Sequence, residues 1–102
     1  MTDELPPGVA IETIFVIEAT YGPDAAERRR PVRAEHLARI ARLRDEGIVF
    51  EAGGYLDFST ALMLVRAPDA DAALALFADD VYLRTGVWTE LRARPLGRVV
   101  RG

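Results

Sequence analysis

Two stretches of the chain carry apolar side chains at consecutive positions, which is the pattern of strands that are covered on both faces. They are residues 14–17 (Ile-Phe-Val-Ile) and residues 62–65 (Leu-Met-Leu-Val). Successive side chains of a strand point to opposite sides of its sheet, so each stretch presents apolar groups to both sides. A sheet that contains these strands must pack against something on each face, and this requirement limits the folds available to the chain.

The apolar patterns predict four strands, over residues 11–20, 48–52, 60–67 and 87–94. A helix is predicted over residues 31–46, because Pro31 suits a first turn and Gly47 suits a helix stop. A second helix is predicted from Asp69, a good helix cap, to about Asp80. The predicted order is therefore strand, helix, strand, strand, helix, strand.

This order predicts an α+β fold of the ferredoxin-like βαββαβ type, with both helices on one face of a four-stranded antiparallel sheet. We expect residues 1–8 to be a flexible leader and residues 9–102 to form a single domain, since 102 residues suffice for one core. An apolar sheet face without a cover would be unusual in a soluble monomer. A second copy of the same sheet is the simplest cover, so we predict a homodimer. The sequence leaves open whether Phe15 and Met63 or their neighbours face the partner.

The residue types that are missing exclude several kinds of chemistry. The chain has no Cys, which excludes disulfides, thiolate metal sites and cysteine nucleophiles. All 13 basic residues are Arg, so no lysine is available for a Schiff base. A single His cannot form a multi-histidine metal site, and we expect no metal and no other cofactor. Histidine is the side chain that exchanges protons near neutral pH, and His36 is the only one.

The charge pattern argues against nucleic acid and membrane partners. The net charge is −3 and the chain has no basic face, so the attraction to phosphates that dominates nucleic-acid binding is missing. The one basic run, residues 28–30, is predicted to lie in a solvated loop. No apolar run approaches the roughly 18 residues that a membrane-spanning helix needs. The first residues are acidic where a targeting segment would be basic, so we expect a cytoplasmic location.

His36 lies on the inward side of the first predicted helix. At about 100° per residue, it falls within the apolar arc that Leu37, Ile40 and Leu43 define. Arg33 lies within or beside the same arc, one turn earlier. An unpaired buried polar group costs about 1–3 kcal/mol, so the imidazole must have a partner. A backbone carbonyl is one candidate, in which case His36 is a core histidine and Arg33 a residue at the rim.

Other candidate site residues also have a plain structural interpretation. Asp80 follows an apolar helix and could mark only its end. The first interpretation of Gly53 and Gly54 is that they form a turn. The second is that they allow a ligand to approach the backbone closely. Tyr82 and Trp88 are more often core or interface aromatics than part of a ligand pocket.

Two short motifs bear on these alternatives together. The first is residues 33–37 (Arg-Ala-Glu-His-Leu), followed by Leu43, Gly47 and Ala52-Gly53. The second is residues 80–82 (Asp-Val-Tyr), followed by Gly86-Val87. Their spacing and order over residues 12–95 resemble the YciI-like (YCII-related) family. The chain departs from that pattern at Val81, where the family usually has proline, and at Gly54, where it often has proline. It also has a shorter loop between the second and third strands.

The resemblance implies a dimeric α+β barrel and an active site that pairs His36 with Asp80. It points to a small-molecule enzyme that carries out elimination, isomerisation or hydrolysis on an aromatic or lactone-like substrate. His36 would transfer the proton and Asp80 would orient the ring. Because both helices of the predicted fold pack on the same side of the sheet, we expect an imidazole nitrogen and a carboxylate oxygen of one subunit to lie within about 3 Å of each other or to be linked by one water. The other residues expected at the substrate are Arg33, Tyr82, Gly53 and Gly54. The alternatives are a non-catalytic dimeric module that binds a small molecule or regulates, and a cofactor-free monooxygenase.

Overall fold

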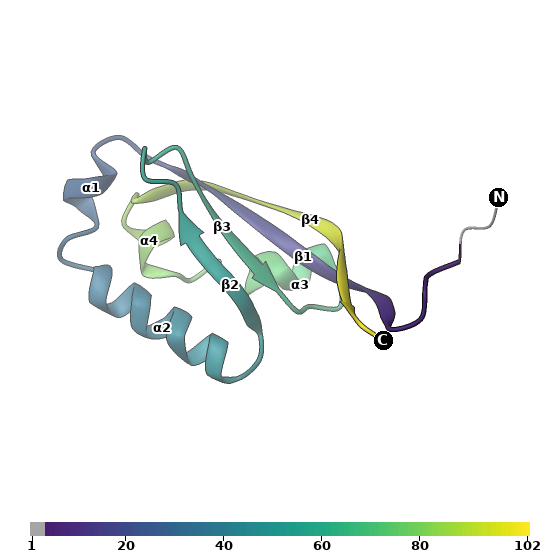
Figure 1. Ribbon diagram of the computed structural model, residues 1–102. Coiled ribbons are helices and arrows are strands. Elements are labelled where there is room, and N and C mark those ends of the chain that lie inside the picture. Colours follow the sequence, from purple (N-terminus) through teal and green to yellow (C-terminus); the bar gives the residue numbers. More distant parts are fainter. Residues whose placement is uncertain (1–3) are drawn as a thin grey trace.

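A computed structural model describes residues 4–102 and contains one four-stranded antiparallel sheet (Figure 1). The strands are β1 (Val9–Tyr21), β2 (Val49–Gly54), β3 (Thr60–Val65) and β4 (Trp88–Arg101), in the order β2-β3-β1-β4. The helices are α1 (Ala25–Arg28), α2 (Arg33–Asp45), α3 (Ala70–Ala75) and α4 (Val81–Arg84). The predicted α+β, ferredoxin-like arrangement is confirmed.

The helix ends follow the signals in the sequence, with some shifts. Gly47 has a φ of 75° and follows α2, as predicted for a helix stop. The side chain of Asp69 accepts a hydrogen bond from the Ala72 amide at 2.8 Å and caps α3. The second helix was predicted to reach Asp80, but α3 ends at Ala75. The single turns α1 and α4 were not predicted, because four residues are too few to show a helical period.

The last strand is longer than predicted. It was expected to end at Arg94, but β4 continues through Pro95 to Arg101. A proline is tolerated there because β4 lies at the edge of the sheet, where one side of the strand needs no hydrogen bonds. β1 pairs with β4 along its whole length, whereas it pairs with β3 only over residues 15–20. The outer parts of β1 and β4 therefore form a two-stranded arm beside the chain ends (Figure 1).

The core lies between the sheet and the helices. Phe15 and Ile17 of β1 and Met63 and Val65 of β3 belong to it, together with Phe77 after α3. Phe15 and Met63 therefore face the helices, which answers a question that the sequence left open. Since strand residues alternate, the neighbours of these residues lie on the opposite face of the sheet.

On the face of the sheet that lies opposite the helices, charged pairs lie beside the apolar side chains. Glu18 pairs with Arg94 at 2.7 Å and with Arg92 at 3.7 Å. Glu12 pairs with Arg66 at 2.9 Å. The apolar part of this face includes Val16, Leu62 and Leu64. Because of the charged pairs, it is narrower than the apolar runs at residues 14–17 and 62–65 alone would predict.

The chain before β1 has no regular structure in its described part. Of the leader predicted over residues 1–8, residues 1–3 lie outside the described chain. Residues 4–8 contain no helix or strand and end in a turn at Gly8, with a φ of 82°. Within residues 4–102, no helix has the length and apolar character that crossing a membrane requires.

Candidate active site

His36 and Asp80 form a buried hydrogen-bonded pair. His36 Nδ1 lies 2.8 Å from Asp80 Oδ1, and the two residues are 6% and 0% exposed. A carboxylate oxygen only accepts, so Nδ1 is the donor of this hydrogen bond, and in the neutral form of the imidazole the lone pair is then on Nε2. The distance of about 3 Å predicted from the sequence is confirmed within one subunit. The alternative in which a backbone carbonyl is the partner of this histidine is wrong.

Asp80 is held in place because it also caps a helix. It is the residue before α4, and its Oδ1 accepts a second hydrogen bond, from the Tyr82 amide at 2.9 Å. Val81 stands where the family pattern usually has proline, so this turn lacks the restriction that a proline ring would impose. The cap supplies the missing constraint, because it ties the carboxylate to the backbone two residues later.

The second oxygen of the carboxylate faces an arginine from α2. Arg39 Nη1 lies 3.6 Å from Asp80 Oδ2. The same guanidinium donates to the Leu76 carbonyl and lies 5.3 Å from the centre of the Phe77 ring. A buried carboxylate is costly unless it is paired, so Arg39 and His36 together make the burial of Asp80 possible.

Two aromatic rings fix the orientation of the imidazole. The Tyr82 ring stacks on His36 with centroids 3.7 Å apart and planes 10° apart. The Trp88 ring meets the imidazole edge-on, at 5.0 Å and 86°. With Nδ1 bound to Asp80 and both rings in contact, the imidazole has one orientation, which determines where Nε2 points.

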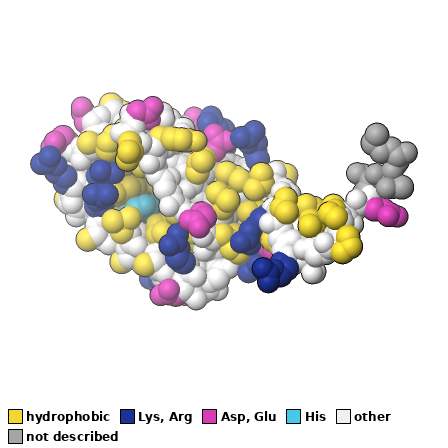
Figure 2. All heavy atoms as spheres, in the orientation of Figure 1, with side chains coloured by type: hydrophobic (Ala, Val, Ile, Leu, Met, Phe, Trp, Pro, Cys, Tyr) yellow, Lys and Arg dark blue, Asp and Glu magenta, His cyan; other side chains and the backbone are white. Residues whose placement is uncertain are grey.

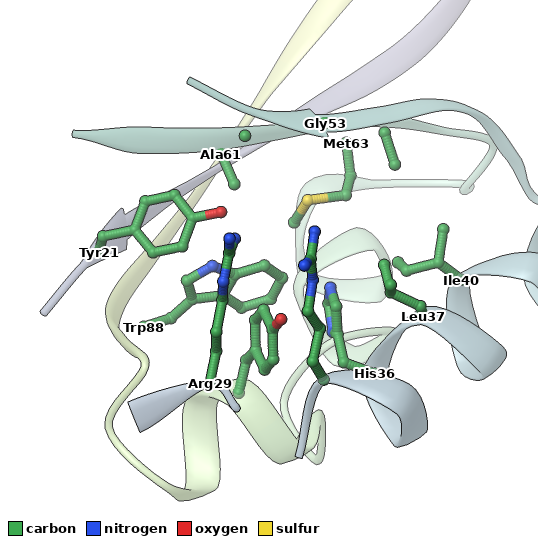
Figure 3. Close-up of a pocket in the computed structure, with 13 residues that line it drawn as sticks. Tyr21, Arg29, His36, Leu37, Ile40, Gly53, Ala61, Met63 and Trp88 are labelled. Atoms are coloured by element: carbon green, nitrogen blue, oxygen red, sulfur yellow. The ribbon is translucent and has the colours of Figure 1, made fainter. Parts of the chain in front are cut away.

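A cavity of about 210 Å³ opens beside the imidazole, between the sheet and α2 (Figure 3). In the space-filling view the imidazole, in cyan, is visible at the bottom of a hollow with basic side chains beside it (Figure 2). Arg33, Tyr82, Gly53 and Gly54, all predicted at the substrate, line this cavity. Asp80 does not line it and lies behind the imidazole.

Three polar residues at the cavity were not predicted there, namely Arg29, Tyr21 and Trp88. Arg29 was expected in a solvated loop, but it is half-buried and its guanidinium lies 4.6 Å from the centre of the Phe58 ring. Trp88 is 1% exposed, and its Nε1 has no hydrogen-bond partner among the described residues. Nothing in the local sequence distinguishes Arg29 from Arg28, because the difference arises from a contact with a distant loop.

The two glycines of β2 are not equivalent. A Cβ atom on Gly54 would overlap the Tyr21 hydroxyl, so the absence of a side chain lets that tyrosine reach across the cavity. A Cβ atom on Gly53 would meet nothing within 4 Å. The turn interpretation of these residues is therefore too simple, since both lie in the last part of strand β2 and line the cavity.

The ionisation of Tyr82 is set by its surroundings. Burial raises the pKa of Tyr82 above the ordinary tyrosine value, although the charges of Arg29 and Arg33 act in the opposite direction. The phenol therefore keeps its proton at neutral pH and can donate a hydrogen bond. Among residues 4–102, no three His, Asp or Glu side chains gather in a group that could hold a metal ion.

Comparisons with known proteins identify the family of this chain. A family model described as the YCII-related domain matches residues 13–96. This chain belongs to the YCII-related family. The protein YciI of Escherichia coli is 30% identical over 96 residues, which cover 84% of this chain and 98% of that protein. An uncharacterized protein of Haemophilus influenzae is 27% identical over 95 residues, covering 83% and 97%.

A solved structure shows the same fold. It is the 5-chloro-2-hydroxyhydroquinone dehydrochlorinase TftG of Burkholderia phenoliruptrix, in complex with 2,5-dihydroxybenzoquinone. The two folds superpose with a TM-score of 0.67, covering 79% of this chain and 90% of TftG, at 18% sequence identity. At this identity the likeness establishes the α+β fold and no more.

Proposed function

We propose that this chain is a small-molecule enzyme that uses His36 and Asp80 as a general acid–base pair. The observation that carries the proposal is the buried 2.8 Å contact between His36 Nδ1 and Asp80 Oδ1 at the wall of a 210 Å³ cavity. Asp80 selects the tautomer in which Nε2 has the free lone pair. Nε2 is then the atom that accepts a proton from a ligand in the cavity.

The surroundings suit an imidazole that gains and loses a proton. When Nε2 takes a proton the ring becomes positively charged, and the hydrogen bond to Asp80 becomes charge-assisted and stronger. Stacking against Tyr82 keeps the ring in place during this change. Elimination, isomerisation and hydrolysis all need a base positioned in this way.

Among these reactions we favour elimination. The fold neighbour TftG is named as a dehydrochlorinase. A dehydrochlorination removes a proton and a chloride from one molecule. The base accepts the proton, the electrons of that bond form a new π bond, and chloride leaves with the electrons of the C–Cl bond. His36 would supply the base, and a small hydroxylated ring compound would be the substrate.

The experiment compares the native protein with three variants, His36→Gln, Asp80→Asn and Asp79→Asn. Asp79 is the matched control because it is the exposed neighbour of Asp80. The substrates are 5-chloro-2-hydroxyhydroquinone and a panel of small phenols, lactones and enols. We expect His36→Gln to lower kcat by about 10²–10⁴-fold. We expect Asp80→Asn to lower kcat more than it raises KM, and Asp79→Asn to change neither.

One outcome would decide against His36 as the base, and a second outcome would decide against an enzyme. A compound that His36→Gln turns over as fast as the native protein would remove His36 from the chemistry. A compound that binds the cavity tightly in native and His36→Gln protein, with no turnover across the whole panel, would favour the non-catalytic binding module.

We also propose that the functional unit is a homodimer that forms through the sheet face opposite the helices. Leu62, Leu64 and Tyr55 line a mostly apolar groove of about 290 Å³ on that face. Tyr55 is 56% exposed and the adjacent Leu56 is 97% exposed. A second copy of the chain would cover this groove and the exposed side chains of Tyr55 and Leu56.

The dimer is tested with Leu64→Arg, which would place an unpaired charge in the interface. The control is Val99→Arg, because Val99 is already 71% exposed and lies on the other side of the sheet. Light scattering at micromolar concentration should give about twice 11.2 kDa for the native protein and the control. Leu64→Arg should give the monomer mass. A native monomer would contradict the proposal.

A further inference from the structure

Two arginines at the cavity have no carboxylate partner among residues 4–102. Most arginines of the described chain form ion pairs, for example Arg66 with Glu12 at 2.9 Å. Within residues 4–102, Arg29 and Arg33 form none, although both line the cavity. Their positive charges are therefore not neutralised by a neighbouring side chain of this part of the chain.

Within the described part of the chain, the lining of the cavity contains no carboxylate either. Of the thirteen side chains and backbone segments that line it, none is Asp or Glu. Asp80 lies behind the imidazole, and its Oδ1 already accepts from His36 and from the Tyr82 amide. A concave site with two cations and no anion attracts negatively charged ligands.

The structure holds one of these guanidinium groups in position. Arg29 lies over the face of Phe58, 4.6 Å from its centroid, a favourable cation–π distance. Phe58 has a φ of 60°, which is unusual for a phenylalanine and is expected where the surroundings require it. The Phe58 ring also meets Tyr21 edge-on at 5.3 Å. Figure 3 shows Arg29 directed from the helix side toward the sheet, into the space beside Tyr21.

The remaining polar groups at the cavity are also donors. Trp88 Nε1 is buried and has no partner among residues 4–102, and Figure 3 shows this nitrogen on the side of the indole toward Tyr21 and Ala61. An unpaired buried N–H is unfavourable, so a ligand oxygen that accepts from it would relieve that cost. Tyr82 keeps its proton because burial raises its pKa. In the neutral form of the imidazole, Nε2 of His36 is an acceptor.

The size and the apolar wall of the cavity limit the ligand further. A cavity of about 210 Å³ holds little more than one substituted six-membered ring, since benzene fits a cavity of about 150 Å³. Met63, Ile40 and Leu37 supply apolar surface for such a ring. We propose that the site selects a small planar anion, with its carboxylate or enolate oxygens bound by Arg29, Arg33 and Trp88 Nε1. This inference rests on the proposed function, because it names the substrate class of the same site.

The test measures binding rather than turnover, with benzoate and its neutral isostere benzamide as probes. Isothermal titration calorimetry is carried out on the native protein and on Arg29→Met, Arg33→Met and Arg42→Met. Arg42 is the matched control, since it is an exposed arginine of α2 that lies outside the cavity and removes the same charge. Trp88, the only tryptophan, reports by its fluorescence whether the probe enters the cavity.

We expect benzoate to bind the native protein and Arg42→Met alike, and to bind Arg29→Met and Arg33→Met at least about tenfold more weakly. Benzamide should bind weakly and equally to all four proteins. Arg29→Lys should recover part of the benzoate affinity, because it keeps the charge but loses the planar fork. Trp88→Phe should also weaken benzoate binding without altering the weak binding of benzamide.

The inference is overturned if benzoate shows no binding at millimolar concentration, or if benzoate and benzamide bind equally to the native protein and the arginine variants. Benzoate needs no acid–base step, so His36→Gln should still bind it. A failure of the His36 proposal therefore leaves this result unchanged. Conversely, unaffected benzoate binding in Arg29→Met and Arg33→Met overturns the anion inference even if His36→Gln abolishes turnover.

Discussion

Replacing Asp80 by alanine tests how much stability the buried pair contributes. The change removes the α4 cap, which is worth about 1 kcal/mol. It also leaves His36 Nδ1 buried without a partner, at a further cost of about 1–3 kcal/mol. We therefore expect the free energy of unfolding to fall by about 2–4 kcal/mol. For a chain of this length, that loss lowers Tm on the order of 10–20 °C.

Urea unfolding followed by Trp88 fluorescence measures this loss, with all proteins at the same concentration because a dimer's stability depends on it. Asp79→Ala is the control and should change the free energy of unfolding by less than about 0.5 kcal/mol, as exposed substitutions usually do. Asp80→Asn keeps an acceptor oxygen and a good cap, so it should lose about 1 kcal/mol. Equal losses in Asp80→Ala and Asp79→Ala would refute the reasoning.

Two further predictions concern the cavity wall. Gly54→Ala should cost about 1–3 kcal/mol of stability because its Cβ overlaps the Tyr21 hydroxyl, whereas Gly53→Ala should be neutral or slightly stabilising in the same urea assay. Burial raises the pKa of Tyr82, so its contribution to stability is present below the ordinary tyrosine value of about 10 and is lost as pH rises through the folded value. The free energy of unfolding, measured from about pH 9 to about pH 11, should therefore depend less on pH in Tyr82→Phe than in Tyr55→Phe. Identical pH dependences of the two variants would contradict this.

The fold was predictable because its signals are local and repeated. The strands, the cap at Asp69 and the stop at Gly47 each follow from a few neighbouring residues. The extension of β4 past Pro95 was missed because it depends on pairing with the distant strand β1, which only the three-dimensional structure provides. A proline marks the end of a strand in most sequences, and its position at a sheet edge is not visible locally.

The part of the site that depends on a single distinctive residue type could be predicted from the sequence. The rest of the site could not. His36 stood out because it is the only histidine and lies on an inward helix face, while the pairing with Asp80 was suggested by the family resemblance. Arg29 was missed because its position depends on Phe58, a residue 29 positions later with an unusual backbone conformation. Phe58 lies in the loop between β2 and β3, so a contact from this loop orients a cavity arginine.

This chain has Val81 where the family pattern usually has proline. The difference leads to a prediction that a substitution raises the stability of the protein. Val81 is the first residue of α4, the helix position where proline is most favourable, because its amide needs no partner inside the helix. Asp80 before it has φ −62° and ψ 137°, the extended conformation that a following proline requires. Val81→Pro should therefore raise the free energy of unfolding by about 0.4–1 kcal/mol, by restricting the unfolded chain. Urea unfolding checks this, and the histidine NMR signals of His36 should stay unchanged. A loss of stability, or a shifted imidazole signal, would mean that Val81 contributes to the turn through its own packing.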